Sequence, residues 1–228
     1  MPRSRPHTNN KKPGNKKSSN KKPGKWAIRQ NRDPFVRQAR SQGLRARSVF
    51  KLEQIDQKYK LIKLSSKIVD LGSVPGSWSQ YAASKVVGSN QIVGMDLLPM
   101  KDIARVRFIQ GDFCDPDNQQ RIFDCFEDGK IDLVLSDMAP NITGIRITDQ
   151  ANAAQLQDVI LAFCLKALNV HGNLLTKLFE GESVGFVRKK FIEHFDQVQM
   201  VKPDASRAES KEVYLLARGF KLNSSRPD

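Results

Sequence analysis

The candidates for chemistry in this chain are four charged residues that lie far apart in the sequence, namely Lys51, Asp137, Lys177 and Glu212. A single lysine or carboxylate in a globular domain is usually a solvated surface residue. Two lysines and two carboxylates that meet in one place form a charged site, which is suited to removing a proton from a hydroxyl group. We therefore interpret the chain as an enzyme whose fold must bring these four side chains together.

The elements that must position them alternate between strands and helices. Short apolar runs predict strands at residues 67–71, 91–96, 106–109, 131–135, 173–178, 196–202 and 211–218. Three- and four-residue apolar spacing and flanking turn residues predict helices at residues 33–60, 77–87, 117–127, 149–169 and 184–195. This alternation predicts an α/β fold with a seven-stranded, mostly parallel sheet and helices on both faces. Ligands of such sheets bind at the carboxyl ends of the strands, where Asp137 and Lys177 fall.

The loop after the first predicted strand contains Gly72 and Gly76, which are four residues apart. A dinucleotide-binding loop needs three glycines at G-x-G-x-x-G spacing, so the pattern disfavours a dehydrogenase. A two-glycine loop suits S-adenosylmethionine, which has no phosphate to bind. Asp96 ends the second strand, where a carboxylate can accept hydrogen bonds from both ribose hydroxyls. Asp112 follows the third strand, and it either accepts from the adenine amino group or is only a turn residue.

Positive charge is concentrated near the N-terminus. Residues 1–40 contain 13 lysines and arginines against one acid, which accounts for +12 of the net charge of +14. A five-residue repeat, in which Asn-Lys-Lys recurs, runs from Asn10 to Gly24 without an apolar residue. We expect residues 1–30 to form a disordered basic arm and residues 31–228 to form the enzymatic domain. The arm either contacts the phosphate backbone of a nucleic acid, which we favour, or only solubilises the chain.

Several features limit the cellular setting. No stretch approaches 18 consecutive apolar residues, so we expect no membrane partner. The basic N-terminus precedes no apolar segment, which disfavours a secretory signal, and its prolines and glycines disfavour a mitochondrial presequence. The three cysteines lack metal-ligand spacing, which fits unpaired thiols in a reducing cytoplasm and predicts no metal site. We expect a cytoplasmic monomer.

Six segments of the chain together resemble the FtsJ-type 2′-O-ribose methyltransferases, above all the bacterial members that act on large-subunit ribosomal RNA. The resemblance implies a Rossmann-like methyltransferase fold that uses S-adenosylmethionine. It places the cofactor positions on Gly76, Trp78, Asp96, Asp112 and Asp137, and the catalytic positions on Lys51, Asp137, Lys177 and Glu212. Ser77 stands where the family usually has glycine and adds a Cβ beside the expected cofactor. The matching segments are residues 48–52, 70–81, 96–100, 110–113, 136–141 and 202–208.

The resemblance implies methyl transfer to the 2′-hydroxyl of a uridine in large-subunit ribosomal RNA, on the assembled subunit. We expect Lys177 to take the proton, because repulsion from Lys51 and partial desolvation would both lower its pKa. Asp137 would orient Lys177, and Glu212 would orient Lys51 or the ribose. In a milder version the lysines only stabilise the developing alkoxide.

Two other functions stay open. The first is the same reaction on transfer RNA or a messenger cap, although a cap enzyme needs an aromatic pair that the chain does not obviously supply. The second is an RNA-binding ribosome-assembly factor without catalysis, which would not need all four charged residues.

Overall fold

The computed structural model describes residues 33–88, 91–181, 183–207 and 209–221. The predicted basic arm, residues 1–30, lies outside the described residues. Within the described part, no helix is both long enough and apolar enough to cross a membrane.

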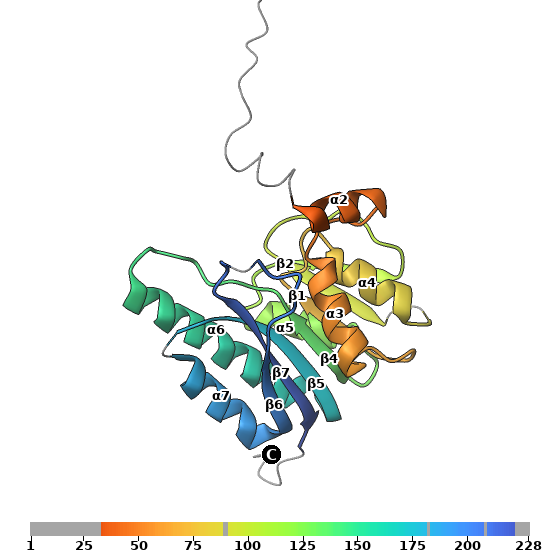
Figure 1. Ribbon diagram of the computed structural model, residues 1–228. Coiled ribbons are helices and arrows are strands. Elements are labelled where there is room, and N and C mark those ends of the chain that lie inside the picture. The colour runs from red at the N-terminus through yellow and green to blue at the C-terminus, as the bar shows by residue number, and fades with distance from the viewer. Residues whose placement is uncertain (1–32, 89–90, 182, 208, 222–228) are drawn as a thin grey trace, which may run out of the picture.

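Seven strands form one sheet in the order β3-β2-β1-β4-β5-β7-β6 (Figure 1). Strand β7 runs antiparallel to both of its neighbours, whereas all the other strand pairs are parallel. The predicted mostly parallel sheet of seven strands is therefore confirmed. The strands are β1 (Ile68–Leu71), β2 (Ile92–Asp96), β3 (Val106–Gln110), β4 (Ile131–Ser136), β5 (Leu168–Phe179), β6 (Phe195–Val201) and β7 (Glu212–Phe220).

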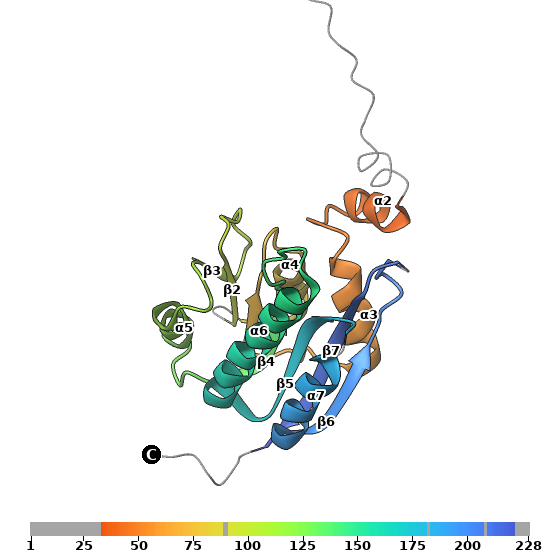
Figure 2. The same ribbon diagram turned by 90° about the vertical axis from the view of Figure 1, so that its left-hand side faces the viewer.

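Helices cover both faces of this sheet, which makes a three-layer molecule (Figures 1 and 2). One apolar core joins α3 (Val49–Tyr59) and α4 (Ser77–Lys85) to one face, with a contribution from α2 (Pro34–Ser41). The other core joins α5 (Pro116–Phe123), α6 (Arg146–Ala167) and α7 (Ser183–His194) to the opposite face.

The central strand β1 shows why its sequence is a continuous apolar run. Val69 and Leu71 pack into the core under α5, α6 and α7, and Ile68 packs into the core under α3 and α4. All four residues of β1 are buried, as expected for a parallel strand covered on both faces. Asp70 is the one polar residue of β1. It accepts a hydrogen bond of 2.6 Å from the Ser79 hydroxyl of α4, and burial raises its pKa to about 7.

The structure corrects the predicted helix at residues 33–60, which is two helices. Helix α2 ends at Ser41, and Gly43 follows with φ at +66°, a conformation that favours glycine. The Leu44 amide then donates to the Ala39 carbonyl at 2.9 Å, which closes the end of α2 and turns the chain toward α3. The apolar spacing predicted each helix but not this turn.

The predicted helix at residues 149–169 is displaced toward the N-terminus. Helix α6 begins at Arg146 and ends at Ala167, so Asn169, the last residue of the predicted helix, lies inside β5 together with Gly172. Leu168 is buried and pairs with Ile131, and the Asn169 side-chain amide donates to Asp132 at 2.7 Å. These tertiary contacts extend β5, although its pairing with β4 is irregular at this end.

The sheet order also predicts where a ligand binds. Strands β1 and β4 are neighbours, but the chain leaves β1 for α4 on one face and β4 for α6 on the other. Loops that diverge in this way leave a crevice at the carboxyl ends of the two strands.

Candidate functional site

The four predicted catalytic side chains form one charged cluster. Lys51 comes from α3 and forms an ion pair with Glu212, the first residue of β7, and each side chain is 14% exposed. Lys177 comes from β5, and its Nζ lies 3.1 Å from Oδ1 of Asp137 at the end of β4. Lys177 also donates a hydrogen bond to the backbone carbonyl of Asp137. The structure therefore brings together residues that are up to 161 positions apart.

Tyr214 joins the two ion pairs, a role that was not predicted from the sequence. Its hydroxyl lies 3.0 Å from Oδ1 of Asp137 and 2.8 Å from Oε1 of Glu212, so it bridges the two carboxylates. Tyr214 sits opposite Lys177 in the antiparallel pairing of β5 and β7. The signal in the sequence is the spacing of Glu212 and Tyr214, because residues two apart in a strand share a face.

Burial and charge shift the pKa values of two residues in this cluster. Burial alone would raise the pKa of Glu212, but hydrogen bonding and charge attraction from Lys51, with help from Tyr214 and Lys177, hold it below its usual value. The pKa of Tyr214 is raised well above its usual range, first by burial and then by the charges of Asp137 and Glu212. Tyr214 therefore stays protonated and Glu212 stays charged at neutral pH.

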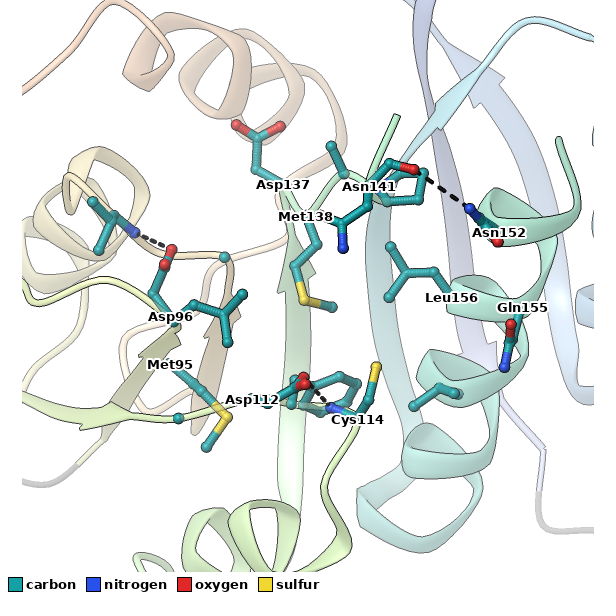
Figure 3. A pocket seen from close by; sticks show the side chains of 18 residues that line it. Met95, Asp96, Asp112, Cys114, Asp137, Met138, Asn141, Asn152, Gln155 and Leu156 are labelled. Carbon is teal, nitrogen blue, oxygen red and sulfur yellow. Dashed lines mark hydrogen bonds between the residues drawn. The ribbon is translucent and has the colours of Figure 1, made fainter. Parts of the chain in front are cut away.

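A cavity of about 680 Å³ opens beside the charged cluster at the carboxyl ends of β1 to β4 (Figure 3). Asp137 belongs both to the lining of this cavity and to the cluster. A group bound in the cavity therefore meets the charged cluster at Asp137. The lining consists of Gly72, Val74, Met95, Asp96, Leu97, Gly111, Asp112, Phe113, Cys114, Asp137, Met138, Ala139, Pro140, Asn141, Asn152, Gln155, Leu156 and Val159.

Asp96 and Asp112, both predicted to bind the cofactor, line the cavity on the side of β2 and β3. The Asp96 carboxylate accepts hydrogen bonds of 2.9 Å from the backbone amides of Val74 and Leu98, which fix its orientation. The Asp112 carboxylate accepts one of 2.9 Å from the amide of Cys114. Asp112 is therefore a turn residue that also lines the cavity, so the two alternatives are compatible.

Gly76 and Trp78, the other predicted cofactor residues, do not belong to the cavity lining. Gly76 has φ at +101°, and a Cβ there would lie 2.6 Å from Ile103 and 2.8 Å from Met100. Trp78 is buried, donates to the Ser48 carbonyl at 2.8 Å, and packs with its ring centroid 5.7 Å from that of Tyr214. Gly76 thus allows a tight turn, and the Trp78 ring packs against the Tyr214 ring.

Ser77, which departs from the usual family glycine, also lies outside the cavity lining. Its side chain is buried and accepts a hydrogen bond of 3.0 Å from the hydroxyl of Ser48, the residue that directly precedes α3. It therefore faces the helix that carries Lys51. Among the described residues, no group of three histidine, cysteine or acidic side chains could hold a metal ion.

Comparisons with known proteins identify relatives of this chain. The chain is 43% identical over 206 residues to the ribosomal RNA large subunit methyltransferase E of Marinobacter nauticus, a match that covers 90% of this chain and 98% of that protein. It is 40% identical over 205 residues to the protein of the same name from Legionella pneumophila, covering 90% and 100%.

The same relationship appears in a solved structure and in a family model. A putative ribosomal RNA methyltransferase from Plasmodium falciparum superimposes with a TM-score of 0.68 at 29% identity, covering 77% of this chain and 98% of that one. The model of the FtsJ-like methyltransferases matches residues 44–220, which include all four residues of the charged cluster. The chain therefore belongs to the FtsJ-like methyltransferase family.

Proposed function

We propose that this enzyme transfers a methyl group from S-adenosylmethionine to a ribose 2′-hydroxyl in large-subunit ribosomal RNA. The observation that carries the proposal is the position of Asp137, which lines the large cavity and also contacts Lys177 and Tyr214. A methyl donor in the cavity and a hydroxyl at the charged cluster would then meet at one residue. The names of the relatives support ribosomal RNA as the substrate.

The cavity has the properties that a nucleoside cofactor needs. Its volume lies within the usual range for small-ligand sites. Gly72 allows the end of β1 to approach β4 closely, because a Cβ there would lie 2.7 Å from the Met138 side chain. The fixed carboxylate of Asp96 keeps lone pairs that suit two ribose hydroxyls, and Asp112 keeps acceptor capacity for an amino group. When bound, the cofactor would supply an activated methyl group on a sulfonium.

The charged cluster would act on the ribose hydroxyl. The ribose oxygen would take the methyl group that the bound cofactor supplies, and the proton of the hydroxyl would go to Nζ of Lys177, which accepts it only when its amine is uncharged. Asp137 holds Lys177 in place by two contacts, to its carboxylate and its carbonyl. Lys51, oriented by Glu212, would stabilise the negative charge that develops on the oxygen.

The proposed setting follows from the substrate. A ribosomal RNA substrate fits a reaction in the cytoplasm, and we favour a uridine on the assembled large subunit as the target. The whole charged cluster comes from one chain, which supports a monomer as the active form. The net charge of +14 favours association with an RNA backbone.

Transfer of labelled methyl groups from S-adenosylmethionine tests this proposal. The substrates are undermethylated large subunits, naked ribosomal RNA and transfer RNA, and ribose methylation is mapped on each product. One methylated 2′-hydroxyl in large-subunit ribosomal RNA is the expected result. Label on transfer RNA alone would overturn the substrate. No label on any RNA would favour the alternative of a non-catalytic RNA-binding assembly factor.

A further inference from the structure

A cluster of exposed isoleucines borders the cavity but has no part in the proposed chemistry. Ile142, Ile145 and Ile147 are 71%, 64% and 81% exposed, and they fall within six residues of each other. Ile142 and Ile145 lie in the loop before α6, and Ile147 is the second residue of that helix; we call residues 142–147 together the isoleucine loop. Single exposed apolar residues are ordinary, but several in one short loop beside a site indicate an interaction surface.

The isoleucine loop continues directly from the cavity lining. Ala139, Pro140 and Asn141 line the cavity, and Ile142 is the next residue along the chain. The Asn152 side-chain amide of α6 donates to the Asn141 carbonyl at 3.4 Å, as Figure 3 shows. The loop therefore begins at the rim of the cavity.

The backbone of the isoleucine loop is held in place by hydrogen bonds. The Asp149 carboxylate accepts hydrogen bonds of 2.7 Å from both the amide and the hydroxyl of Thr143, and one of 3.2 Å from the amide of Gly144. These bonds hold the pKa of Asp149 below its usual value. A loop that is ordered before binding loses little conformational entropy when a ligand arrives. The isoleucines are thus displayed by an ordered loop.

We propose that the isoleucine loop is an apolar contact for an unstacked RNA base next to the methylated nucleotide. This inference rests on the proposed function. Sequence-specific recognition of RNA mostly targets single-stranded segments whose bases are unstacked, and an unstacked base exposes a flat apolar face. The exposed side chain of Arg146 lies between two of the isoleucines in the sequence, which suits the adjacent phosphates.

A protein partner fits this surface less well. A stable protein interface buries about 800 Å² on each partner, which needs some 20–30 residues, whereas three isoleucines in a polar loop are few.

Figures 1 and 2 place α2, where the described chain begins, and the start of α6 toward the same end of the molecule. RNA that reaches the charged cluster can therefore contact the isoleucine loop and the N-terminal side of the protein together.

The test compares the triple variant Ile142→Ala/Ile145→Ala/Ile147→Ala with Leu64→Ala/Val87→Ala. Leu64 and Val87 are 68% and 66% exposed, and they lie near the amino ends of β1 and β2, away from the cavity. For the triple variant we expect KM for undermethylated large subunits and Kd for a large-subunit ribosomal RNA transcript to rise on the order of 5- to 50-fold, because apolar contact area is lost. Its kcat and its calorimetric affinity for S-adenosylmethionine should stay unchanged, and the control should match the wild type.

A second measurement identifies the base. Abasic substitution at the nucleotides that flank the methylated one should weaken wild-type binding, with no further loss in the triple variant. Equal losses in both proteins, an unchanged KM, or a loss confined to assembled subunits would overturn the proposal, the last in favour of a ribosomal protein. Binding of the labelled transcript needs no turnover. It therefore reports on the isoleucine loop even if the proposed methyl transfer fails.

Discussion

Substituting Tyr214 with phenylalanine tests the link between the two ion pairs. The variant loses one hydroxyl that bonds to two carboxylates, at 3.0 Å from Asp137 and 2.8 Å from Glu212. The hydroxyl has a single proton, which the two carboxylates share, and a hydrogen bond to a charged group contributes about 1.5–3 kcal/mol. Removing a buried hydroxyl also relieves part of its desolvation cost, which leaves an expected loss of about 2 kcal/mol in the free energy of unfolding.

This loss should depend on pH in a defined direction. The pKa of Glu212 is lowered in the folded protein, so its contribution to stability is present above the usual value of 4.5 and is lost as pH falls through the folded pKa. The Tyr214 hydrogen bond is one cause of that lowering. The difference between wild type and variant should therefore be largest near neutral pH and should shrink in acid.

Urea unfolding at about pH 7 and about pH 3 measures both effects. The matched control is Tyr59→Phe, whose ring lies on α3 away from the charged cluster and contacts Lys58 and Arg218. We expect the control to unfold like the wild type at both pH values. A Tyr214→Phe variant as stable as the wild type at neutral pH, or a loss of the same size at both pH values, would refute the reasoning.

Three further predictions concern the cavity and the arm. Asp96→Asn replaces one carboxylate oxygen by an NH2 group, which cannot accept the hydrogen bond that a backbone amide donates there. The calorimetric affinity for S-adenosylmethionine should therefore fall about tenfold or more; unchanged affinity would contradict the cofactor role of Asp96. Gly72→Ala puts a Cβ 2.7 Å from the Met138 side chain at φ +72°. It should therefore lower the free energy of unfolding by about 1–3 kcal/mol, whereas an unchanged melting temperature would show that the loop relaxes. Removing residues 1–30 should weaken RNA binding and flatten its salt dependence without changing cofactor affinity; equal salt slopes would leave the arm as a tail.

The central strands of this fold could be predicted because strands that are buried on both faces appear in the sequence as continuous apolar runs. Val69, Leu71, Val134 and Leu135 are fully buried, and their runs end at the loops that form the cavity. Asp96 and Asp112 follow such runs, which is why they could be placed at one edge of the sheet. The same pattern placed Lys177 near the end of β5.

Features that depend on tertiary contacts were harder to predict. The bridge made by Tyr214 requires the register of β5 against β7, which no local pattern specifies. The turn at Gly43 is stabilised by backbone bonds from Gly43 to Arg40 and from Leu44 to Ala39, and by the distant Gln80 side-chain amide, which donates to the Gly43 carbonyl, within a sequence that is otherwise helical in spacing. Gly76 and Trp78 followed from the resemblance, but only the packing shows that Gly76 faces Ile103 and Trp78 backs Tyr214.

The central claim is that Lys177 takes the proton during ribose methylation, and single-turnover methyl transfer with Lys177→Ala and Lys177→Arg tests it most directly. Arginine keeps the positive charge but cannot accept a proton, so both variants should lose about 10²- to 10⁴-fold in rate if Lys177 is the base. Lys190→Ala is the control, because Lys190 pairs with Asp158 on the helical surface. Near-normal turnover of a folded Lys177→Ala variant would contradict the claim, and activity kept only by Lys177→Arg would reduce Lys177 to stabilising charge.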